Sequence, residues 1–131
     1  MAKPYSRQYY VDMAQKHYFG NVDAKNLQAV LDCFNQDAVF TIQSSFTVHE
    51  GRDTGIKRMF ERLFENHTNI LHTDFGTIAD VEGESVSSRF RAELDHKDGS
   101  HTTLMNVNHW YLKHGKFQRV FVWMSGENVL K

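Results

Sequence analysis

The sequence has little cysteine, little proline and no excess of charge of either sign. Its 131 residues include a single cysteine, Cys33, which excludes an internal disulfide and a multi-cysteine zinc site. Lys and Arg number 15 against 16 Asp and Glu, so no strong field attracts nucleic acid or an anionic membrane. The longest purely apolar run, Val120–Met124, is too short to span a bilayer. We therefore expect neither nucleic acid nor a membrane as a partner.

The residues that are abundant indicate a globular chain. Apolar residues make up 40% and aromatic residues 13%, which suffices for a sizeable core at this length. Pro4 is the one proline, and no repeat or linker is visible. These features predict a single domain over residues 1–131. Because residues 1–7 lack the apolar stretch of a signal peptide, we expect a cytoplasmic protein.

Apolar residues at helical spacing mark the first half of the chain. Gly20-Asn21 is expected to end a first helix, and Asp23 to cap a second one. Residues 38–43 are rich in strand-forming types, and Gly51 opens a third helix. The apolar stripe of the first helix consists of Tyr10, Met13, Ala14, His17 and Tyr18.

After His67 the pattern changes to the alternation of strands. Strands are expected over residues 70–81, 86–94, 102–113 and 117–124. Helices first and a meander after predict an α+β fold, with three N-terminal helices packed on one face of a curved antiparallel sheet.

The late strands carry large side chains on both faces. One face of the strand at 102–113 has Asn106, Asn108, Trp110 and Leu112, and the other has Met105, Val107, His109 and Tyr111. The helices can cover one face only, and a large exposed apolar patch is a liability. We therefore expect a two-fold homodimer through the uncovered face. The alternative is that loops or the chain termini cover it.

Asn106 and Asn108 are the most informative polar residues. They share a strand face with apolar neighbours, and burying an amide without a partner costs about 1–3 kcal/mol. Either they bond to each other and to the helices, or they line a wet pocket. An amide both donates and accepts, which suits a carbonyl or hydroxyl on an otherwise apolar ligand.

His72 and Asp74 lie two residues apart on a predicted strand and should share a face. They form a candidate general base with an orienting carboxylate. The alternatives are a solvated strand end or a polar pair on the dimer face. No spacing of ligands indicates a metal, and no glycine-rich phosphate loop is present, so neither a metal nor a cofactor is expected.

Five stretches along the chain carry a family resemblance. They are Tyr18–Asp23, Asp37–Phe40, Glu50–Arg52, Phe90–Leu94, and Asn108–Tyr111 with Gly115–Phe117. In this order they resemble the nuclear transport factor 2-like superfamily, which includes ketosteroid isomerases and SnoaL-like polyketide cyclases. The resemblance covers residues 8–124. It implies a cone-shaped barrel that encloses a pocket, with the convex sheet face making a dimer.

The resemblance also implies site residues. Tyr18 matches the oxyanion-donating tyrosine of ketosteroid isomerases, and Asn108 matches their protonated aspartate. Their base matches Ile42, and an isoleucine cannot take a proton. With the base candidates from the strand pattern added, the expected catalytic set is Tyr18 and Asn108 with His72 or Asp74, although Tyr18 is equally typical of a core tyrosine. The implied ligand-binding residues are Phe40, Ile42, Phe60, Ser88, Phe90, Asn106 and Trp110.

The resulting expectation is a SnoaL-like protein that holds a small, mostly apolar ligand in a cone-shaped pocket. The reaction classes are isomerisation, dehydration or aldol-type cyclisation by proton transfer. Two alternatives stay open: a non-catalytic ligand-binding module that lacks the catalytic carboxylates, and a dimerisation unit whose cone is filled by aromatic side chains.

Overall fold

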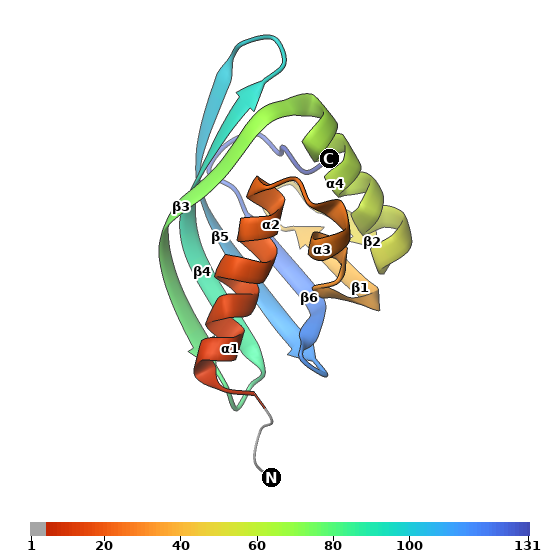
Figure 1. Ribbon diagram of the computed structural model, residues 1–131, viewed down its shortest axis with the longest axis vertical. Helices are drawn as coiled ribbons and strands as arrows, with labels where there is room; N and C mark the ends of the chain where they lie inside the picture. Colours follow the sequence, from red (N-terminus) through yellow and green to blue (C-terminus); the bar gives the residue numbers. More distant parts are fainter. Residues whose placement is uncertain (1–4) are drawn as a thin grey trace.

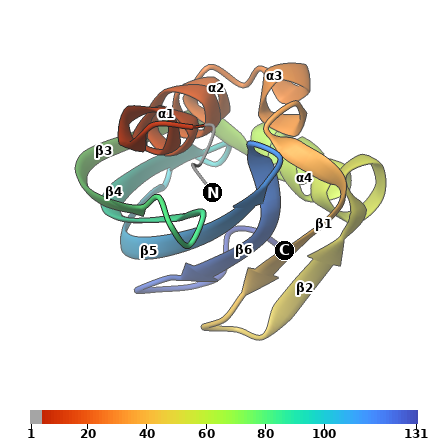
Figure 2. The same ribbon diagram turned by 90° about the horizontal axis from the view of Figure 1, so that it is seen from below.

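A computed structural model describes residues 5–131, with helices arranged across the concave side of one curved sheet (Figures 1 and 2). α1, η1 and α2 follow one another as a single helix, of which η1 has π-helical hydrogen bonding. The elements in order are α1 (Arg7–Asp12), η1 (Met13–Phe19), α2 (Gly20–Asp23), α3 (Leu27–Leu31), β1 (Phe34–Ile42), β2 (Thr47–Glu50), η2 (Gly51–Ile56), α4 (Lys57–Asn66), β3 (His67–Asp80), β4 (Ser85–His96), β5 (His101–Lys113) and β6 (Lys116–Trp123).

The first helix runs further than the sequence predicted. Gly20 lies inside it rather than at its end. A glycine inside a helix costs about 1 kcal/mol, which the burial of Phe19 and Val22 offsets. Asp23 is therefore the last residue of the first helix and does not cap the second. Asn26 caps α3 instead, with its side chain accepting from the backbone N–H of Ala29 at 3.2 Å.

The sheet has six strands in the order β2-β1-β6-β5-β4-β3. The expected α+β fold, with helices on one face and four long strands at the end, is confirmed. Two details differ. β2 was not predicted, and β1 runs parallel to β6, so the sheet is mixed rather than wholly antiparallel. Within residues 5–131 no pairing joins β2 to β3, so the cone is a curved open sheet rather than a closed barrel.

The two faces of the sheet differ as the alternation in β4 and β5 predicted. On the concave side Phe90 and Trp110 are buried under the helices. On the convex side Met105, Val107 and Tyr111 are exposed by 42–53%. The helices of the described part of the chain include none that is long and apolar enough to cross a membrane.

An aromatic cluster lies between the helices and the concave face of the sheet. The ring of Tyr18 makes edge-to-face contacts with Trp110, Phe60 and Phe117, at centroid distances of 5.6–6.0 Å. Trp110 is fully buried, and its indole N–H has no hydrogen-bond partner among the described residues. Large rings therefore occupy much of the space between the helices and the sheet.

Candidate functional site

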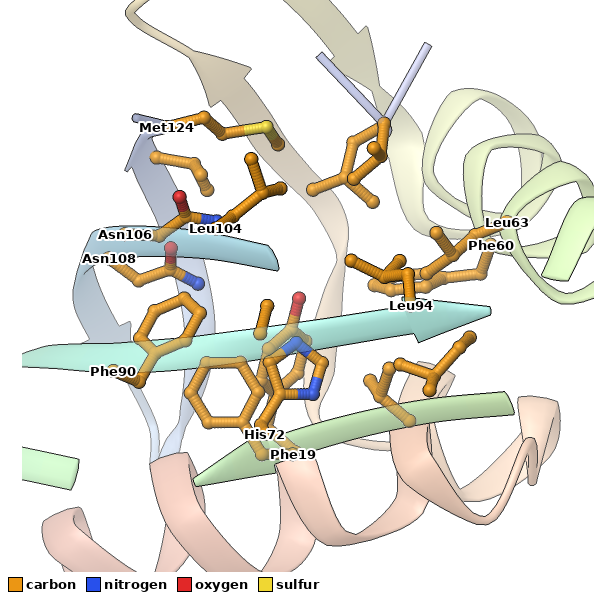
Figure 3. Close-up of a pocket in the computed structure, with 17 residues that line it drawn as sticks. Phe19, Phe60, Leu63, His72, Phe90, Leu94, Leu104, Asn106, Asn108 and Met124 are labelled. Atoms are coloured by element: carbon orange, nitrogen blue, oxygen red, sulfur yellow. The ribbon is translucent and has the colours of Figure 1, made fainter. Parts of the chain in front are cut away.

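A cavity of about 30 Å³ remains between the first helix, α4 and the concave face of the sheet (Figure 3). Of the described residues that line it, none is Lys, Arg, Asp or Glu. Four lining side chains can make hydrogen bonds, namely Tyr18, His72, Asn106 and Asn108. The cavity is therefore apolar and uncharged, with a few polar groups converging on it.

His72 reaches the cavity because of its register in β3. It pairs with Ala92 of β4, which lies on the concave face, so the two side chains point to the same side. The imidazole packs against Phe19 and Phe90, at ring-centroid distances of 4.5 and 5.4 Å (Figure 3). Apolar packing on two sides fixes the orientation of the ring.

Asp23 holds His72 with both carboxylate oxygens. Nδ1 of His72 lies 2.6 Å from Oδ1 of Asp23, and the backbone N–H of His72 donates to Oδ2 at 2.9 Å. The side chains of His72 and Asp23 are 11% and 20% exposed. Because a carboxylate only accepts, Nδ1 carries a proton, and a neutral ring then has its lone pair on Nε2. Nε2 has no hydrogen-bond partner within residues 5–131.

Asn106 and Asn108 project side by side from β5 on the sheet side of the cavity (Figure 3). They are 5% and 2% exposed. Oδ1 of Asn106 accepts the backbone N–H of Ser125 at 3.2 Å. Oδ1 of Asn108 is buried and has no partner in the described part of the chain. A buried acceptor without a donor is costly, and a hydroxyl group on a ligand would satisfy it by donating a hydrogen bond.

Tyr18 lies on the cavity wall as well as in the aromatic cluster. Burial, with smaller contributions from Cys33 and Asp23, raises the pKa of its hydroxyl far above the usual value. The phenol therefore stays protonated at any ordinary pH and can donate a hydrogen bond. No hydrogen-bond partner of the hydroxyl is found among residues 5–131.

Asp74 does not share the face of His72, and that prediction is wrong. The pairing of β3 with β4 shifts between Thr73 and Gly76, and Asp74 in this bulge has a φ of 56°. Its carboxylate is 63% exposed and lies 3.5 Å from Arg89. The bulge thus separates two residues that regular alternation would place together.

The predicted ligand-binding residues divide into two groups. Phe60, Phe90 and Asn106 line the cavity. The remaining four, Phe40, Ile42, Ser88 and Trp110, are fully or almost fully buried but are not part of its wall. Trp110 packs against the lining residues Tyr18 and Phe19, and the hydroxyl of Ser88 is bonded to that of Thr77 at 2.9 Å.

Asp23 was not predicted as a site residue. One signal could have pointed to it, because a carboxylate at the C-terminal end of a helix is disfavoured by the helix dipole. Such a residue commonly has a partner elsewhere, here His72. Within residues 5–131, no three or more His, Cys, Asp or Glu side chains are grouped to hold a metal ion.

Comparisons with known proteins agree with this architecture. Residues 15–120 match the SnoaL-like domain family. No curated protein has a significant match. A candidate polyketide cyclase from Xanthomonas campestris superimposes with a TM-score of 0.80 and 16% identity, covering 89% of this chain and 90% of that one.

Two further solved structures are similar. SalBIII, an epoxide hydrolase/cyclase-like enzyme of pyran ring formation in salinomycin, has a TM-score of 0.79 and 18% identity, over 90% of this chain and 92% of its own. A protein with a ketosteroid isomerase-like fold from Catenulispora acidiphila, in complex with trimethylamine, has a TM-score of 0.75 and 14% identity. The match covers 87% of this chain and 86% of that one. At these identities the likeness shows the fold alone.

Proposed function

The chain belongs to the SnoaL-like domain family, and on that premise we propose that it binds a small neutral carbonyl compound in its cavity and moves a proton on it. The observation that carries this proposal is the Asp23–His72 pair. One ring nitrogen is held by a carboxylate, and the other is left without a partner in the cavity wall. This is the arrangement that a general base needs.

The base of this proposal is Nε2 of His72. It removes a proton from the carbon next to the carbonyl group, and the electron pair of that C–H bond moves to form an enolate. The carboxylate of Asp23 stabilises the imidazolium that results. A base on β3 replaces the one that the family resemblance placed at Ile42 of β1, which is buried outside the cavity.

Tyr18 and Asn108 are the proposed partners of the carbonyl oxygen. The protonated phenol of Tyr18 and the Nδ2 group of Asn108 donate to the oxygen, on which negative charge develops. Return of the proton at another carbon gives isomerisation. Loss of a hydroxide ion from the neighbouring carbon gives dehydration, and attack of the enolate on a second carbonyl gives cyclisation.

The absence of charge among the described lining residues limits the substrate class. Neither a carboxylate nor a phosphate would meet a cation in the cavity wall. Two of the similar solved structures, a candidate polyketide cyclase and the epoxide hydrolase/cyclase-like enzyme SalBIII, support cyclisation among these reactions. The second candidate function is binding without turnover, which the small volume of the cavity favours.

The test is the exchange of the α-protons of cyclopentanone with deuterium oxide, followed by proton NMR. The wild-type protein should accelerate the exchange, and His72→Phe should lower that rate by about 10²-fold or more. Phenylalanine keeps the ring packing, and the backbone N–H of residue 72 can still bond to Asp23. Asp74→Asn is the matched control and should leave the rate unchanged. Equal rates in wild type and His72→Phe would leave binding without turnover as the function.

We also propose a homodimer through the convex face. Leu71, Met105, Val107 and Trp123 form an exposed apolar surface there, each 42–53% exposed. Arg91 and Glu93 flank it, so a second copy related by two-fold symmetry can bring opposite charges together. Sedimentation at micromolar concentration should show a dimer that Val107→Glu dissociates. A wild-type monomer would contradict this proposal.

A further inference from the structure

The chain after β6 closes the cavity at one end. We define the C-terminal strap as residues 125–131, which form neither helix nor strand and end beside α4 (Figure 1). Val129 and Leu130 of the strap line the cavity, and Leu130 is only 9% exposed. The strap therefore supplies part of the cavity wall.

The strap is held by separate hydrogen bonds rather than by a strand ladder. His49 Nε2 lies 2.8 Å from the carbonyl oxygen of Leu130, and Asn128 donates to the hydroxyl of Thr47 at 3.3 Å. At its start the backbone N–H of Ser125 donates to Asn106. Every other wall of the cavity belongs to a helix or to a paired strand, apart from Met124 beside the strap.

A second, open space lies on the other side of the strap. This groove has a volume of about 530 Å³, and Arg62, His67 and His96 form part of its wall. Leu104 and Val129 line both the groove and the cavity. The strap therefore lies between the small cavity and the larger groove, and Val129 forms part of both walls.

The closed cavity is too small for the proposed substrate. A volume of about 30 Å³ accommodates one or two water molecules. Any cyclic ketone is larger than that, and the rings of Phe19, Phe60 and Phe90 are held by their neighbours in the core. Substrate binding thus requires a wall to move, and the strap is the wall with the fewest attachments.

We propose that the C-terminal strap is a displaceable plug of the ligand site. The side chain of Leu130 occupies the position that the apolar part of a ligand takes, and binding moves the strap so that the cavity joins the groove. The ligand is an apolar carbonyl compound larger than the closed cavity. This inference rests on the proposed function, because it assumes that ligands bind in the cavity.

The test uses prodan, a neutral naphthalene ketone whose emission shifts to the blue in apolar surroundings, in stopped-flow mixing with the full chain. With wild type the observed rate should level off as the prodan concentration rises, because opening of the strap limits it. Leu130→Ala should raise that limiting rate about tenfold or more, since less buried apolar surface holds the strap closed. Leu112→Ala removes the same atoms from a buried site outside the cavity and should not change the rate.

A second pair of variants tests the hydrogen bond to the strap. His49→Leu removes the group that donates to the carbonyl oxygen of Leu130 and should also raise the limiting rate. In His49→Gln the side-chain amide can donate to the same oxygen, so the limiting rate should return to the wild-type value. Hydrogen exchange of the wild-type chain is independent of any variant. Prodan should accelerate exchange at the backbone N–H groups of Ser125 and Met105, because the first donates to Asn106 and the second to the hydroxyl of Ser125, and both bonds join the strap to β5.

Two results would overturn the plug. A rate that rises linearly with prodan and is equal in all variants would show a preformed or surface site, and the proposed function would stand. If neither the wild-type protein nor any variant binds prodan, Leu130→Ala included, the result would contradict the proposed function and the plug together.

Discussion

Among residues 5–131, two histidines are bound by carboxylates. His72 in the cavity wall forms the inner pair with Asp23, and His101 on the convex face of the sheet lies between Asp95 and Glu93, a group that we call the outer pair. In the inner pair, Asp23 binds Nδ1 of His72 and leaves Nε2 unpartnered among the described residues. In the outer pair, Asp95 binds Nδ1 of His101 at 2.6 Å and Glu93 binds Nε2. The His101 side chain is 46% exposed, against 11% for His72.

The difference shows why the same residue types serve different purposes. Both nitrogens of His101 are engaged by carboxylates, which raise its pKa and hold it as a cation without a free lone pair. It is therefore suited to an ion pair. His72 has one carboxylate for orientation and one free nitrogen beside an uncharged cavity. Proximity of a histidine to a carboxylate is thus insufficient evidence of a base, and the environment of the second nitrogen decides.

The largest effect is expected from removing the charge of the inner pair. Asp23→Asn should lower the rate of proton exchange in the ketone by about 10²-fold. The imidazolium of His72 loses its counter-charge, and the neutral ring is no longer held in the tautomer with its proton on Nδ1. Nitrogen-15 NMR should show the proton of His72 moving from Nδ1 to Nε2, a change that a merely structural role would not produce. Asp95→Asn is the matched change in the outer pair and should leave exchange unaltered. If both variants lose activity equally, the comparison between the pairs is wrong.

An intermediate effect is expected from the amide that faces the inner pair across the cavity. Asn108→Leu removes a buried, unpartnered oxygen and should raise the free energy of unfolding by about 1 kcal/mol or more, while it lowers exchange. Asn106→Leu is the control and should bring no such gain, because its oxygen is bonded to Ser125. Urea unfolding of both variants measures the difference. A loss of stability in Asn108→Leu would mean that its amide is satisfied.

The smallest effect concerns the outer pair and depends on pH. Hydrogen bonds from His101, Thr103 and Arg91 lower the pKa of Glu93 from 4.5 to about 2. Its contribution to stability is therefore present above about pH 4.5 and is lost as the pH falls through about 2. His101 has a raised pKa, so its contribution is complete below its usual value of 6.5 and is lost as the pH rises through the raised value.

Glu93→Gln should accordingly be less stable than wild type by the largest margin between about pH 4.5 and 6.5. The difference in stability between wild type and Glu93→Gln should shrink below and above this pH range. The control is Glu61→Gln, at an exposed position of α4. Thermal unfolding over this pH range measures it. A margin that does not vary with pH would show that the charges of the outer pair are not coupled.

The sequence predicted most where the chain alternates without interruption. In β4 and β5 the period of two held, so the face that carries Phe90, Asn106 and Asn108 was identified correctly. In β3 the bulge at Asp74 breaks the period, and no local pattern announced it. A one-residue change of register moves a side chain to the opposite face, which is why Asp74 was misplaced.

Features that depend on distant contacts were less accessible. The parallel pairing of β1 with β6 joins segments about 80 residues apart, and neither strand shows it in its own composition. The partnership of Asp23 with His72 spans 49 positions in the same way. The strap was missed because residues 125–131 have no periodicity, although Val129 and Leu130 are apolar. Three-dimensional packing, rather than local propensity, determines each of these.

The burial of Trp110 gives the protein an internal optical reporter. The chain has two tryptophans, of which Trp110 is fully buried and Trp123 is 44% exposed. Trp123→Phe would therefore leave one emitter, which contacts the rings of Tyr18 and Phe19 in the cavity wall. Its emission should be blue-shifted, because the indole lies among aromatic rings rather than in water. Occupancy of the cavity then becomes readable from the light the protein itself emits, without a label.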